Sequence, residues 1–205
     1  MNRSVRHARV AISLMIFAVC FLAVAPRVQA AETASSVYNS GIRKYQSGDL
    51  SGASADFTRA IAINPLHWKS YSSRCVLKTD QGDFDGAILD CSRAIEINSK
   101  DAGVYSNRGV AYCEKKALAA ALADYSTALS LDPNDYYTYN NRGTVHADRG
   151  ELELAIADFS RAITLRPDYA ESYYNRSIVK RRNGDEVGAK VDRARAGELN
   201  PKCQK

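Results

Sequence analysis

The apolar residues of the chain follow two patterns. Near the start, an apolar run extends from Val10 to Ala25 and is interrupted only by Ser13. From about residue 34 onward, small and large side chains recur at intervals of 34 residues. Five alanines and five aspartates keep this interval, which predicts five consecutive structural units. They are Ala53, Ala87, Ala121, Ala155 and Ala189, and Asp56, Asp90, Asp124, Asp158 and Asp192.

This interval resembles the tetratricopeptide repeat, a unit of two helices, A and B, joined by a turn. In that family helix A carries a large and a small slot, and helix B carries an aromatic between two alanines. Val37, Cys91 and Arg193 are the residues that depart from these types. The large slot holds Val37, Tyr71, Tyr105, Tyr139 and Tyr173, and the small slot holds Gly41, Cys75, Gly109, Gly143 and Ser177. The aromatic slot holds Phe57, Cys91, Tyr125, Phe159 and Arg193.

The resemblance implies an all-α fold, a right-handed solenoid of about five helix-turn-helix units at residues 34–203, after an N-terminal signal peptide. One helix pair cannot bury its apolar face alone, so neighbouring pairs stack and bury it between them. The last helix, Asp185–Leu199, has Arg193 and Gly197 in apolar slots, which predicts a polar outer face that ends the stack. The units are expected near residues 34–67, 68–101, 102–135, 136–169 and 170–203.

Glycine occupies the turn between helices A and B in four of the five units. A residue after a helix end often adopts the left-handed conformation that glycine reaches at low cost. Lys116 stands in this slot in the third unit, so we expect a slightly different turn there. The four glycines are Gly48, Gly82, Gly150 and Gly184.

Residues 1–30 have the layout of a secretory signal peptide. Three arginines precede the apolar run, and the small-residue pattern Val28-Gln29-Ala30 follows it. The run is shorter than the roughly 20 residues that a membrane-spanning helix needs. We therefore expect cleavage after Ala30 or one residue later, export to the periplasm, and no stable membrane insertion after cleavage. The alternative is an uncleaved N-terminal membrane anchor, which also carries the repeats out of the cytoplasm.

The signal segment changes what the net charge implies. It holds 4 of the 28 basic residues and no acidic one, so 24 basic side chains face 23 acidic ones in the remainder. A nucleic-acid partner requires a basic face. We therefore expect a protein or peptide partner and no nucleic acid.

Asparagine fills one slot of helix A in four units, and Ser73 fills it in the second. The family resemblance places helix A along a concave groove. A carboxamide offers donors and an acceptor in one plane, which suits the backbone of an extended peptide, and tyrosines beside it are frequent binding anchors. The alternative is that the asparagines satisfy local backbone groups and solvent. The expected partner-binding residues are Asn39, Asn107, Asn141, Asn175, Tyr38, Tyr137 and Tyr174.

Arginine recurs beside the asparagine slot, sixteen residues before the helix B aspartate of the same unit. This spacing predicts an ion pair within each unit, and a partly buried pair would fix the crossing of the two helices. We interpret these arginines as structural residues. The pairs are Arg74 with Asp90, Arg108 with Asp124, Arg142 with Asp158, and Arg176 with Asp192.

Four of the five cysteines follow the signal segment, and their spacing matches no zinc or redox motif, so we expect no metal or cofactor. An oxidising compartment permits disulfides. Cys75 and Cys91 occupy facing core slots of the second unit, and a bridge between them would contribute about 3 kcal/mol. The alternatives are a bridge from Cys91 to Cys113 across units, and two free buried thiols.

No catalytic motif surrounds His67 or His146, so the sequence predicts no enzyme. The hypothesis is a non-enzymatic interaction scaffold or adaptor in the cell envelope, which binds an extended peptide segment in its concave groove. The alternative is a structural subunit of a larger envelope assembly that docks by its convex face or by an end.

Overall fold

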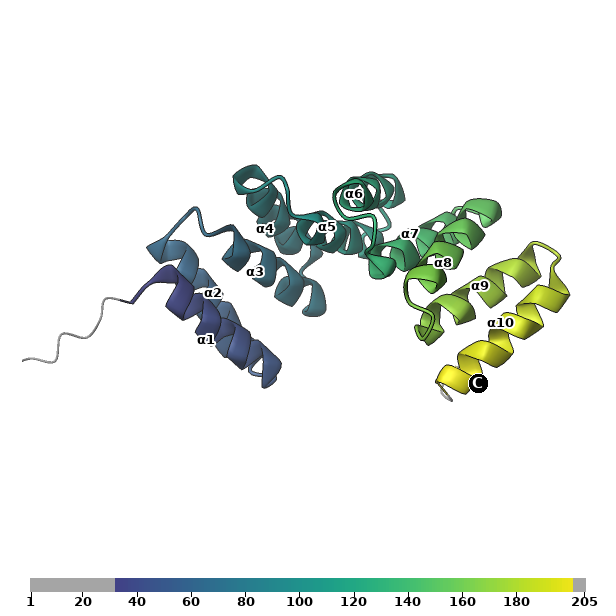
Figure 1. Ribbon diagram of the computed structural model, residues 1–205. Coiled ribbons are helices and arrows are strands. Elements are labelled where there is room, and N and C mark those ends of the chain that lie inside the picture. The colour runs from purple at the N-terminus through teal and green to yellow at the C-terminus, as the bar shows by residue number, and fades with distance from the viewer. Residues whose placement is uncertain (1–31, 201–205) are drawn as a thin grey trace, which may run out of the picture. The chain divides into compact units, whose positions relative to one another are not determined.

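The computed structural model describes residues 32–200, so the predicted signal peptide at residues 1–30 and Cys203 lie outside the described residues. The described chain contains ten α-helices and no strand, which confirms the all-α repeat fold. Figure 1 shows the helices following one another in chain order. They are α1 (Ala34–Gln46), α2 (Leu50–Ile63), α3 (Trp68–Asp80), α4 (Phe84–Ile97), α5 (Ala102–Glu114), α6 (Leu118–Leu131), α7 (Tyr136–Asp148), α8 (Leu152–Leu165), α9 (Ala170–Arg182) and α10 (Glu186–Leu199).

The helices stack as consecutive pairs. Each odd-numbered helix packs against the even-numbered helix that follows it, and that helix packs against the next odd-numbered one. Successive odd-numbered helices also contact each other, whereas within residues 32–200 the even-numbered helices do not. The odd-numbered helices therefore line one side of the stack, which we call the A-helix face.

Three of the even-numbered helices begin with the same cap. Asp49 accepts a hydrogen bond from the backbone N–H of Gly52 at 2.8 Å, and Asp83 and Asp185 cap α4 and α10 in the same way. A Cβ on Gly52 would lie 2.1 Å from the Asp49 carboxylate, so the cap and the glycine depend on each other. The N-cap residue of α6 is Ala117, which provides no side-chain cap.

The turn of the third unit differs only slightly from the others, as expected from Lys116. The four turn glycines have φ between +78° and +86°, and Lys116 adopts the same left-handed conformation at φ 60°. The hydrogen bonds also match: Ala117 N–H donates to the Tyr112 carbonyl at 2.9 Å, as Asp83 N–H donates to the Lys78 carbonyl. Packing of α5 against α6 thus imposes on a lysine a conformation that costs a non-glycine residue about 1 kcal/mol.

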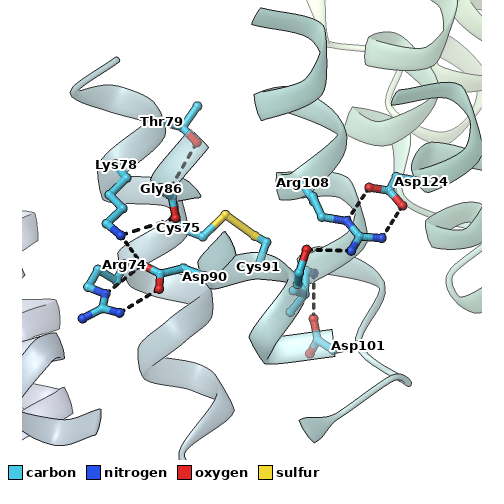
Figure 2. Close-up of a disulfide and its surroundings, with 12 residues drawn as sticks. Arg74, Cys75, Lys78, Thr79, Gly86, Asp90, Cys91, Asp101, Arg108 and Asp124 are labelled. Atoms are coloured by element: carbon cyan, nitrogen blue, oxygen red, sulfur yellow. Dashed lines mark hydrogen bonds and ion pairs between the residues drawn. A yellow bond between two sulfur atoms is a disulfide. The ribbon is translucent and has the colours of Figure 1, made fainter. Parts of the chain in front are cut away.

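The small and aromatic slots meet inside each helix pair. A Cβ on Gly109 would lie 2.6 Å from the Tyr125 ring, and Gly41 with Phe57 and Gly143 with Phe159 repeat this close approach. Only glycine leaves room for the ring at these positions. In the second unit a disulfide between Cys75 and Cys91 replaces the ring contact, with a Cα–Cα distance of 5.5 Å (Figure 2).

The predicted ion pairs are present and partly buried, which confirms their position. Arg74 donates from Nε and Nη2 to the two carboxylate oxygens of Asp90, both at 2.7 Å (Figure 2). Its Nη1 also donates to Thr58 of the preceding unit at 3.0 Å, so one arginine joins two units. Three further arginines repeat the arrangement with the carboxylates Asp124, Asp158 and Asp192 and the hydroxyls Ser92, Ser126 and Ser160.

The outer surface of α10 is less polar than expected. Gly197 is buried and Arg193 is half-buried, with its guanidinium 4.3 Å from the centroid of the Tyr174 ring. The same helix exposes Val187 at 76 % and Val191 at 63 %. The polar cap expected from Arg193 and Gly197 is therefore only partly present, because two valines one turn apart face solvent.

Candidate functional site

Three pockets lie in a row along the last three units, the first two on the A-helix face and the third where α9 of that face meets α10. The first, of 290 Å³, is lined by residues of α5, α6, α7 and α9, among them Thr144 and Asp148. The second, of 160 Å³, shares Thr144 and Asp148 with the first. The third, of 360 Å³, lies between α9 and α10 and shares Ile178 with the second. The shared residues make the three pockets neighbours.

The expected asparagines lie differently with respect to these pockets. Asn141 lines the first pocket and Asn175 lines the second. Asn39 is exposed and Asn107 is half-buried, and neither lines any of the three pockets. The pockets thus bring together the C-terminal half of the asparagine row.

Asn140 is a polar residue of the first pocket that the sequence did not identify. Its side chain is 1 % exposed, and its Oδ1 accepts hydrogen bonds from Ser172 Oγ at 2.9 Å and from Asn175 Nδ2 at 3.3 Å. It stands next to Asn141 in a slot that holds Tyr38, Ser72, Ser106 and Tyr174 in the other units. The residue type in this slot differs between units, so the sequence contains one hint of a role for Asn140: an amide stands where the other units have a hydroxyl or a tyrosine ring.

The three tyrosines expected to anchor a partner have different surroundings. Tyr137 is 51 % exposed and packs in a cluster with Tyr136 and Tyr169, with ring centroids 6.4 and 6.3 Å from its own. Tyr38 is half-buried against Phe57, with the ring centroids 5.8 Å apart. Tyr174 lines the third pocket, where the Arg193 guanidinium covers its ring. Tyr137 is the tyrosine of this set with the largest free surface, because the other two are half-buried against neighbouring side chains.

Charge is distributed unevenly along the pockets. Glu114, Asp148 and Glu171 line the first pocket together with one cation, Lys116. The third pocket has the opposite sign, since its lining includes Arg181, Lys190 and Arg193 and one acid, Glu186. A segment lying along the A-helix face would therefore meet a negative region and then a positive one.

Cys113 is the free thiol of the described chain and lines the first pocket. Its Sγ lies 3.5 Å from the Tyr125 hydroxyl. Burial raises the pKa of the thiol, and although the Tyr125 hydrogen bond opposes this, the charges of Glu114 and Asp148 raise the pKa further. Burial also raises the pKa of the Tyr125 hydroxyl. Both groups therefore stay protonated at neutral pH, as hydrogen-bonding rather than nucleophilic groups.

The two histidines of the described chain are held by neighbouring side chains. His146 Nδ1 lies 2.6 Å from Glu151 Oε2, and His67 Nδ1 lies 2.8 Å from Ser70 Oγ. Among residues 32–200, no group of three or more histidine, cysteine, aspartate or glutamate side chains is placed to hold a metal ion. No helix of the described residues is both long enough and apolar enough to span a membrane.

Comparison with known proteins identifies the repeat. Residues 77–115 and 143–184 match the family described as TPR repeat, and residues 102–135 match the family described as Tetratricopeptide repeat. No curated protein matches the sequence.

Solved structures show the same fold. The crystal structure of MamA protein matches with 21 % identity and a TM-score of 0.71 over 83 % of this chain and 93 % of its own. PilW, described as a widely conserved type IV pilus biogenesis factor, matches with 19 % identity and a TM-score of 0.75 over 81 % and 77 %. YrrB, described as a TPR protein with an unusual peptide-binding site, matches with 17 % identity and a TM-score of 0.66 over 82 % and 87 %.

These structural likenesses establish the fold of stacked helix pairs, and the sequence matches fall on the units that carry the recurring alanines and aromatics. The chain belongs to the tetratricopeptide repeat family.

Proposed function

We propose that the protein is a non-enzymatic scaffold or adaptor that binds an extended segment of a protein partner along the A-helix face. The observation that carries this proposal is the row of three neighbouring pockets, with Asn141 and Asn175 in two of them. A planar carboxamide can donate to and accept from a peptide backbone without regard to its side chains. The exposed ring of Tyr137 adds an apolar contact beside them.

We also propose that binding takes place outside the cytoplasm, in the cell envelope and most simply in the periplasm. Two observations support this location: the signal-peptide layout of residues 1–30, and the Cys75–Cys91 disulfide, a bond typical of oxidising compartments. Mass spectrometry of the protein isolated from cells should find a first residue at Ala31 or Glu32. A chain that still begins at Met1 in the membrane fraction would instead support the uncleaved anchor.

The binding proposal can be tested with peptides selected from a random display library on the isolated protein. The perturbation is the triple variant Asn107→Ala, Asn141→Ala, Asn175→Ala. Loss of three hydrogen bonds to the peptide backbone, of about 1 kcal/mol each, should lower the affinity for a selected peptide on the order of 100-fold. Fluorescence anisotropy gives the affinity, and circular dichroism checks that helicity is unchanged. The matched control is Leu89→Ala, on the surface of α4.

The alternative, a subunit that docks by its even-numbered helices or by an end, rests on exposed apolar side chains. Leu89 is 71 % exposed on α4, Leu154 is 54 % exposed on α8, and α10 exposes Val187 and Val191. If a captured partner binds the triple asparagine variant unchanged but loses binding when Val187 and Val191 become serine, the A-helix proposal is wrong and the docking subunit is favoured.

A further inference from the structure

The first pocket combines residues that lie far apart in the sequence. Glu114 comes from the end of α5, Asn140 and Asp148 come from α7, and Glu171 comes from the start of α9. The pocket has a volume of 290 Å³, enough for one long side chain and its backbone rather than for a folded domain. It is therefore a subsite within the longer A-helix face.

Asn140 is held in place from outside the pocket. Its Oδ1 accepts from Ser172 and Asn175 of α9, which fixes the orientation of the carboxamide. Its Nδ2 has no hydrogen-bond partner among the described residues, although the residue is 1 % exposed and lines the pocket. Within residues 32–200, Nδ2 is not one of the fully buried atoms that lack a partner, so it remains accessible and can donate to a ligand atom inside the pocket.

The acidic side chains at the pocket lack cationic partners. Within residues 32–200, Glu114 and Asp148 form no ion pair, and the contact of Glu171 is a hydrogen bond accepted from the Tyr169 hydroxyl at 2.7 Å. Both Glu114 and Asp148 act on the Cys113 thiol by their charge, which places them around the same space. Three carboxylates and one cation, Lys116, line this pocket, so its lining is net negative, and Arg182 joins Asp148 in the lining of the second pocket.

We infer that this pocket is the subsite for a lysine or arginine side chain of the bound segment, with Asn140 donating to a backbone carbonyl beside it. The cationic head would lie among Glu114, Asp148 and Glu171, and its aliphatic stem would pack on Val110 and Leu118. The third pocket, lined by three cations, opposes the alternative that the whole face selects basic segments. The inference rests on the proposed binding of an extended segment, and it names the residue type that this one pocket selects.

The test uses isotope-labelled protein, purified as cells produce it, and three capped pentapeptides of alanine with arginine, glutamine or glutamate at the centre. Each is titrated to about 10 mM while nitrogen–proton spectra are recorded, since single subsites bind in the millimolar range. The arginine peptide should shift the backbone signals of Glu114 and Asp148 and the side-chain amide signals of Asn140. The glutamine peptide should bind at least about fivefold more weakly, and the difference should shrink with added salt.

A double variant, Glu114→Gln with Asp148→Asn, should abolish the preference for arginine over glutamine. The matched control, Glu96→Gln with Glu153→Gln, removes the same charge from even-numbered helices that line none of the three pockets, and it should leave the preference intact. Equal binding of the glutamine peptide at these residues would overturn the inference and leave the proposed function standing. Arginine-dependent shifts elsewhere would also overturn it, and an A-helix face that none of the peptides perturbs would contradict both proposals.

Discussion

Exchange of the disulfide for the ring contact of the neighbouring units is the sharpest test of how the second unit is held together. The variant Cys75→Gly with Cys91→Phe reproduces the pair that Gly41 with Phe57 forms in the first unit. In the wild-type protein the bridge closes a loop with a sequence separation of 16 residues. A loop of that length contributes about 3 kcal/mol to the free energy of unfolding.

In the exchanged variant, burial of the phenylalanine ring replaces the disulfide as the source of stability, with a contribution of similar size. Cys91 is fully buried in a cluster with Ala87 and Val104, so a phenylalanine ring there would be removed from water. Full burial of such a ring contributes about 1.5–3 kcal/mol. We therefore expect the exchanged protein to approach the stability of the oxidised wild type, and to exceed clearly that of the reduced wild type.

Urea unfolding followed by circular dichroism, with and without a phosphine reductant, measures both effects. Reduction should lower the free energy of unfolding of the wild type by about 3 kcal/mol and leave the exchanged protein unchanged. A thiol count of the isolated protein before reduction should show Cys75 and Cys91 unreactive. If reduction leaves the wild-type transition where it was, the disulfide does not hold this unit and the reasoning fails.

Three further predictions concern the turn and the ion pairs. Lys116→Gly should raise the free energy of unfolding by about 1 kcal/mol, because glycine adopts the left-handed turn without strain, and an unchanged urea midpoint would contradict this. Arg108→Ala should cost about 3–5 kcal/mol, because it leaves the buried Asp124 carboxylate unpaired, whereas Arg93→Ala, in an exposed pair, should leave the urea midpoint nearly unchanged. Burial raises the pKa of Asp192, but hydrogen bonds from its two cationic partners outweigh burial and lower the pKa below its ordinary value. Its contribution is therefore present above about pH 4 and lost as the pH falls through the lowered pKa, and Asp192→Asn should flatten this acid limb of the stability curve.

The sequence by itself determined the repeating part of this protein. The recurring alanines, glycines and aromatics specify a helix pair wherever they occur, because small residues let two helices approach and a ring fills the space between them. The sixteen-residue spacing of Arg74 and Asp90 was sufficient to predict their ion pair, because both residues lie on one helix pair whose geometry the repeat determines. Contacts inside one unit are thus readable from the chain.

The tertiary structure decided what lies between units. The role of Asn140 depends on Ser172 and Asn175, more than 30 residues away on α9, and no pattern within one unit reveals such a partner. The left-handed turn at Lys116 is likewise imposed by the packing of two helices against the preference of the residue. The sign of charge in each pocket arises where side chains of neighbouring helices converge, and these positions are not fixed by stacking, which needs only the small and aromatic slots.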